Sequence, residues 1–131
     1  MIKYKPAPDI QKIAEEVVAR LGWLHVDLQN VAFIRSFDGK SRGTIARCHA
    51  LGKAMQVGMG RRGFYLIEVI SKRFDKLSND EKVKTVIHEL MHIPKSFGGG
   101  FRHHNLVNEK NVNQVWEKYV RLKENDLDGF F

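Results

Sequence analysis

Apolar residues recur at helical spacing near the start of the chain. Between residues 9 and 21 they fall every third or fourth position, at Ile10, Ile13, Ala14, Val17, Val18 and Leu21. This spacing places them on one face of a helix. Gly22 follows directly and suits a helix C-terminus. We therefore predict a helix over residues 9–21.

The next part of the chain carries short apolar and β-branched runs. Residues 31–37 (VAFIRSF) precede the turn signal Asp38-Gly39, and residues 44–51 form a second run. Residues 64–70 (FYLIEVI) form the third and most β-prone run. These runs predict three strands. Residues 52–63 are rich in Gly, Met and Arg and predict a loop, with at most a short strand around Val57.

Helical spacing returns after residue 78. Ser78 and Glu81 form a capping box, and the apolar residues after it predict a helix that Pro94 stops. A glycine-rich loop follows over residues 96–104, and then a last helix with one apolar stripe. The stripes of the two helices are Val83, Val86, Ile87, Leu90 and Met91, and then Val112, Val115, Trp116, Tyr119 and Val120.

The elements predict an α+β fold in one domain over residues 1–131, because no repeat or linker divides the chain. No apolar run approaches the roughly 20 residues of a membrane span, and the N-terminus lacks a secretory leader. The single cysteine, Cys48, cannot form an internal disulfide. A cytoplasmic protein without membrane contact is therefore expected.

The formal net charge of +7 favours weak, non-specific contact with nucleic acid or acidic partners. The alternative is a solvated basic surface without a specific partner. No motif typical of RNA- or DNA-binding domains accompanies the charge.

Candidate chemistry is concentrated in residues 88–92, which match H-E-x-x-H inside the predicted capped helix. Residues four apart lie on one helix face, so His88 and His92 can reach the same ion. Neutral imidazole nitrogens suit Zn²⁺, and Glu89 lies close enough to deprotonate a metal-bound water. The alternative is a pair of structural histidines on an ordinary amphipathic helix.

Zinc usually takes three protein ligands in a catalytic site, so a third is needed. His103 and His104 follow the glycine loop, and Glu109 begins the last helix. Adjacent residues rarely both reach one ion, so one of the two histidines is the candidate, with Glu109 as its competitor. The tighter pattern H-E-x-x-H-x-x-G-x-x-H is absent, because Lys95 stands where that pattern has glycine and Gly98 where it has histidine.

Residues 67–104 resemble a family of small metallopeptidases found in archaea and phages. The shared features are the strand YLIEVI at 65–70, the segment FDKLS at 74–78, HELMHIP at 88–94, and a loop that begins FGG at 97 and ends in Arg and His. The resemblance extends to the strand around Ala46-Arg47 and to the last helix. More distantly, the chain is similar to SprT-like proteases and minigluzincins.

The resemblance implies a zincin-like fold: an N-terminal backing helix, a small twisted mixed sheet of three to four strands, an active-site helix and a C-terminal helix. It aligns the single histidine of the family's loop with His104. The implied ligand set is therefore His88, His92 and His104, with His103 a departure from the pattern.

We predict a zinc-dependent metallopeptidase, in which Glu89 acts as general base and an open cleft takes an extended peptide or protein substrate. Tyr65 faces either that cleft or the core, since strand alternation allows both. One rival is a zinc-dependent endoribonuclease-like hydrolase, which the basic charge would suit and Glu89 argues against. Another is a non-catalytic binding module in which the metal is structural.

Overall fold

The computed structural model describes residues 1–40 and 42–128. In this part of the chain it shows an α+β fold with a four-stranded mixed sheet and five α-helices. In order these are β1 (Lys3–Pro6), α1 (Pro8–Leu21), a 3₁₀ turn η1 (Leu28–Asn30), β2 (Val31–Phe37), β3 (Ala46–Ala50), α2 (Lys53–Met59), β4 (Tyr65–Ile70), α3 (Ser71–Phe74), α4 (Asn79–Met91) and α5 (Glu109–Asp128).

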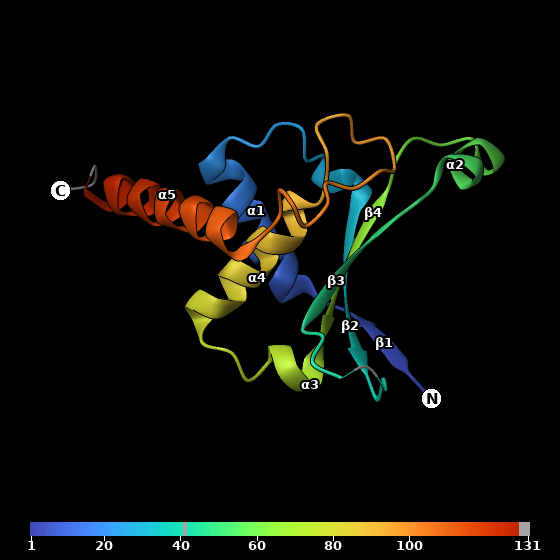
Figure 1. Ribbon diagram of the computed structural model, residues 1–131, viewed down its shortest axis with the longest axis horizontal. Coiled ribbons are helices and arrows are strands. Elements are labelled where there is room, and N and C mark those ends of the chain that lie inside the picture. The colour runs from blue at the N-terminus through green and yellow to red at the C-terminus, as the bar shows by residue number, and fades with distance from the viewer. Residues whose placement is uncertain (41, 129–131) are drawn as a thin grey trace.

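The sheet has the order β1-β2-β4-β3. β2 and β4 are parallel, whereas β1 and β3 run antiparallel to their neighbours. β3 is therefore an edge strand. Figure 1 shows α1, α4 and α5 gathered beside the sheet, while α2 lies at the far end of the β3–β4 pair, away from the other helices.

The core lies between the sheet and these helices. Alternate residues of the central strands point into it, with Tyr65, Ile67 and Val69 of β4 fully buried. Ile10, Ala14 and Val17 of α1, together with Val86, Ile87 and Leu90 of α4, meet them from the helix side. The apolar faces predicted for these two helices are therefore their buried faces.

The helix ends follow from local chemistry. α1 ends at Gly22, which adopts the left-handed conformation with φ 65° and donates its N–H to Ala19 O. Ser78 caps α4, because its hydroxyl oxygen accepts the N–H of Glu81 at 3.2 Å. α4 ends at Met91, earlier than the predicted stop at Pro94. The N–H groups of His92 and Ile93 bond three residues back, to Glu89 O and Leu90 O, so the last turn is tighter than an α-helix.

The predicted loop over residues 52–63 is wrong in part, because Lys53–Met59 form α2 and no strand forms around Val57. The glycines that indicated a loop lie at the ends of this helix. Gly52 precedes it, and Gly60 ends it with φ 64° and its N–H bonded to Val57 O. Most residues between them are good helix formers, and only Val57 and Gly58 have low helix propensity.

β1, η1 and α3 were not predicted. Each has three or four residues, which is too short for periodicity to mark. None of the helices in the described part of the chain has the length and apolar character needed to span a bilayer.

Arg35 of β2 joins two helical elements to the sheet. Its guanidinium donates to Asp9 Oδ1 at 2.5 Å, in the first turn of α1, and to Asp75 Oδ1 at 2.6 Å, just after α3. These hydrogen bonds, against the opposing effect of burial, hold the pKa of both aspartates below the ordinary value. The ion pairs therefore stabilise the fold where the carboxylates are charged.

We expect Arg35→Met to lower the free energy of unfolding by about 1 kcal/mol at pH 7. A depressed carboxyl pKa contributes stability above the unfolded-state value, near pH 4, which is lost as pH falls through the folded-state value. The difference between variant and wild type should therefore shrink below about pH 4. Urea unfolding at several pH values measures this, with exposed Arg121→Met as control. A difference that stays constant down to pH 3 would contradict the role of the ion pairs.

Candidate functional site

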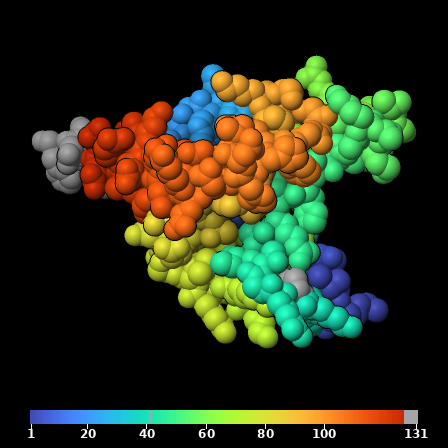
Figure 2. Space-filling view, viewed as in Figure 1, coloured from blue at the N-terminus to red at the C-terminus, as the bar shows by residue number. Residues whose placement is uncertain are grey.

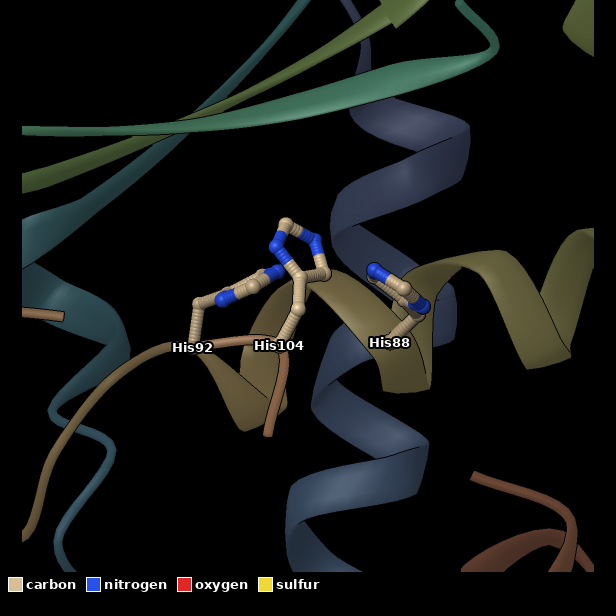
Figure 3. Close-up of side chains that lie close together, drawn as sticks. All are labelled: His88, His92 and His104. Atoms are coloured by element: carbon tan, nitrogen blue, oxygen red, sulfur yellow. The ribbon is translucent and has the colours of Figure 1, made fainter. Parts of the chain in front are cut away.

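Three histidines converge where α4 meets the loop that follows it. His88 lies in the last turn of α4, and His92 is the residue that follows this helix, one turn further on. His104 lies at the end of the glycine loop, residues 96–104 (Figure 3). One ligand nitrogen of each lies within 4.8 Å of the others. Within the described residues, no other group of three or more histidine, cysteine, aspartate or glutamate side chains has its ligand atoms this close together. His103 and Glu109, the alternatives from the sequence, are not in the group.

The ring geometry is compatible with one shared ion. Ring centroids are 5.2 Å apart for His88 and His92, 4.8 Å for His92 and His104, and 5.8 Å for His88 and His104. Nitrogens around a tetrahedral zinc ion lie about 3.4 Å apart. His104 is exposed, so rotation of its side chain can close the remaining gap. The donor set, three imidazoles, fits Zn²⁺.

The tautomer of His92 is set by its surroundings. Its Nδ1 lies 2.6 Å from Arg102 O. A carbonyl oxygen only accepts, so Nδ1 carries the proton and Nε2 is left as a lone-pair donor. Burial lowers the pKa of His88 and His92, and this favours the neutral form that binds metals.

Arg102 also makes a second hydrogen bond with His92, in which Arg102 is the donor. Its backbone N–H donates to His92 O at 2.8 Å. Residues 92 and 102 are therefore joined by two hydrogen bonds, one from each side. Because His104 lies two residues beyond Arg102, this pair brings it back over α4.

Glu89 lies beside the histidine group. Only 6% of the residue is exposed. Burial raises the pKa of its carboxyl group to about 7. Its Oε1 is 4.0 Å from His88 Nε2. A carboxyl group that loses its proton near neutrality, beside a metal-type cluster, suits general base chemistry.

Two hollows flank the histidines. The first, of about 390 Å³, is lined by β3 and the end of the glycine loop, including Cys48, Phe101 and His103. The second, of about 510 Å³, lies between β3, α4 and α5, and includes Thr85 and Glu109. Both reach Ala46 and Glu89, so together they form one open cleft along the edge strand. Figure 2 shows this face hollowed between the loop, in orange, and the β3 segment, in green.

Other reactive side chains have structural surroundings. Burial, and then the charge of Glu89, raises the pKa of the Cys48 thiol to about 12, so the thiol stays protonated. His49 Nε2 lies 2.8 Å from Glu68 Oε1. This pair belongs to the opposite face of the sheet, because His49 alternates with Cys48 along β3.

Comparison with known protein families assigns the chain to a family. A protein-family model described as "Putative phage metallopeptidase" matches residues 2–124, which is nearly the whole chain. The chain belongs to this family. The family description indicates metal-dependent peptidase activity, with peptide or protein substrates. A search of curated proteins and a search of solved structures gave no match.

Two features of the candidate site were not predicted from the sequence. One is Arg102, which bonds His92 through its backbone N–H and C=O groups. Such contacts do not depend on the side chain, so the sequence gives no sign of them. The other is the pair Tyr65 and Gln56, whose side chains contact the glycine loop. Tyr65 lies on the core face of β4, which decides between the two orientations left open above.

We expect elemental analysis of the purified chain to find about one zinc ion per molecule. His104→Ala should lose most of it, because a third ligand is removed. His103→Ala and Glu109→Ala should retain it, since neither side chain joins the converging group. Loss of zinc in Glu109→Ala, with His104→Ala unaffected, would instead indicate a ligand set of two histidines and one glutamate.

Proposed function

We propose that this chain is a zinc metallopeptidase of zincin-like fold that hydrolyses peptide bonds. His88, His92 and His104 hold the ion and Glu89 is the general base. The observation that carries the proposal is the convergence of three imidazole nitrogens within 4.8 Å, beside a buried carboxyl group whose Oε1 lies 4.0 Å from His88 Nε2. The family membership supports the reaction class.

A zinc ion at this position would supply Lewis-acid activation of water and stabilise negative charge on the carbonyl oxygen of the scissile bond. Glu89 takes the proton of the attacking water on a carboxylate oxygen, for which a pKa near neutrality is suited. The same carboxyl group then returns the proton to the leaving amine. His92 is kept in the metal-binding tautomer by Arg102 O.

The substrate is an extended segment of polypeptide. β3 is an edge strand, and its free side borders the cleft. A strand edge offers unpaired N–H and C=O groups to an extended chain. The hollows on both sides of the histidines leave room for residues before and after the scissile bond. This arrangement supports an endopeptidase acting on unfolded or flexible segments.

The decisive variant is Glu89→Gln. It preserves shape but removes the base, so we expect zinc to be retained and cleavage of an unfolded protein to fall by at least about 100-fold. Glu109→Gln, which alters an exposed glutamate in the same cleft, is the matched control and should cleave normally. Mass spectrometry of the products and elemental analysis provide the two measurements.

Labelled RNA incubated with wild type and with Glu89→Gln distinguishes the rival activity. Chelator-sensitive RNA cleavage that Glu89→Gln retains would favour an endoribonuclease. A chain that binds zinc and leaves both RNA and unfolded protein intact would favour a binding module in which the metal is structural.

A further inference from the structure

We propose that Tyr65 and Gln56 are positioning residues for the third metal ligand. Hydrogen bonds from their side chains hold the glycine loop in the course that delivers His104 to the histidine group. The inference rests on the proposed function, because it takes His104 to be a ligand. It goes further in assigning the placement of that ligand to β4 and α2, elements that contribute no ligand themselves.

The Tyr65 hydroxyl binds the backbone of two successive residues of the loop. It accepts the N–H of Gly99 at 3.0 Å and donates to Gly100 O at 2.8 Å. A hydroxyl group can do both at once, and the pair of bonds fixes the direction of the loop as well as its position. The Tyr65 ring also makes edge-to-face contacts with Phe97 and Phe101, at centroid distances of 4.8 and 6.2 Å. Tyr65 is fully buried at the start of a central strand, so it is a rigid anchor.

Gln56 of α2 binds the loop at Gly98, the residue before Gly99. Its Nε2 donates to Gly98 O at 2.9 Å and to Leu51 O at 2.7 Å. Only 6% of Gln56 is exposed, which is unusual for a glutamine on a short helix that projects from the molecule. Both amide hydrogens are used, so the side chain links the loop to the junction of β3 and α2.

The glycines of the loop allow this close contact. Gly99 has φ +102°, and a Cβ there would lie 2.5 Å from Gln56 Nε2 and 2.6 Å from Leu51 O. On the other side of the contact, a Cβ at Gly63 would lie 2.2 Å from Phe97 O. Any side chain at these two positions would push the loop away from the anchors.

The position of His104 depends on the course of its backbone. His104 is exposed, so packing of its own side chain does not hold it. The loop is instead fixed at residues 98–100 by Gln56 and Tyr65, and at Arg102 by His92. Without the first set of bonds the loop would sample other conformations, and metal binding would have to meet the entropy cost of ordering it.

The test compares Tyr65→Phe with Tyr119→Phe. Tyr119 is also a buried tyrosine, 3% exposed, whose hydroxyl contacts Glu16 between α1 and α5, far from the loop. We expect Tyr65→Phe to raise the dissociation constant for zinc, measured by competition with a chromophoric chelator, by about 10-fold or more. Tyr119→Phe should change it by less than about twofold, even where both variants lose similar thermal stability.

Cobalt substitution reports on the ligand itself. The visible absorption of bound Co²⁺ depends on coordination number and geometry, and loss of an imidazole alters it. We expect the Co²⁺ spectrum of Tyr65→Phe to move toward that of His104→Ala. Gln56→Met, which keeps the length of the side chain and removes its donors, should show the same change. It provides the answer if Tyr65→Phe does not fold.

The outcomes separate this inference from the proposed function. Wild type that binds zinc, with Tyr65→Phe and Gln56→Met showing unchanged affinity and unchanged Co²⁺ spectra, overturns the positioning role alone. Wild type that binds no zinc overturns both. Weaker binding in Tyr119→Phe to the same extent would show that general loss of stability is the cause, and would also overturn the inference.

Discussion

The pair of hydrogen bonds between His92 and Arg102 is the contact on which the site depends. One bond, from His92 Nδ1 to Arg102 O, sets the tautomer of a candidate ligand. The other, from Arg102 N to His92 O, fixes where the chain returns after the glycine loop. The contact between residues 92 and 102 thus sets the tautomer of His92 and the position of the backbone near His104. Both effects follow from backbone atoms, so they do not need a particular side chain at position 102.

Packing between the sheet and the helices fixes the elements on both sides of the site. β4 lies between β2 and β3 and is buried over most of its length, so Tyr65 has little freedom. α4 packs against α1 and α5 on one side and faces β3 on the other. The helix that carries two histidines and the strand that anchors the loop are therefore parts of one packed core. The glycine loop that follows α4 is exposed to solvent at His104.

Much of this fold could be predicted from the sequence because the signals are local. The strand over residues 31–37 was predicted with its observed bounds, and the Ser78 cap lies where the capping box placed it. An α+β fold with a small mixed sheet is confirmed. The prediction of a loop at residues 52–63 is wrong in part, because glycines that indicate a loop in the sequence flank a helix, α2, in the structure. Glycine marks a change of backbone direction in both cases, and sequence alone does not separate them.

The residues of the candidate site also fall into two groups, those that local spacing selects and those that it does not. His88, Glu89 and His92 could be selected from sequence because helical geometry fixes their spacing. The choice among His103, His104 and Glu109 could not be made from spacing, since it depends on the course of the loop that follows α4. That loop contacts both nearby and distant parts of the chain, as in the hydrogen bonds of Arg102 with His92, Tyr65 with Gly100, and Gln56 with Gly98. The resemblance to a family indicated His104, and the structure brings that residue, and neither of the others, to the histidine group.

The two edges of the sheet differ in a way that bears on solubility. Open strand edges invite pairing between molecules, which leads to aggregation. β1 resists this, because Lys3 and Lys5 place like charges along its edge and Pro6 has no N–H to donate. β3 has no proline and carries only Arg47 as a charge along its five residues. The composition of β1 therefore opposes pairing with an added strand more strongly than that of β3, which lies on the side of the molecule that holds the histidines.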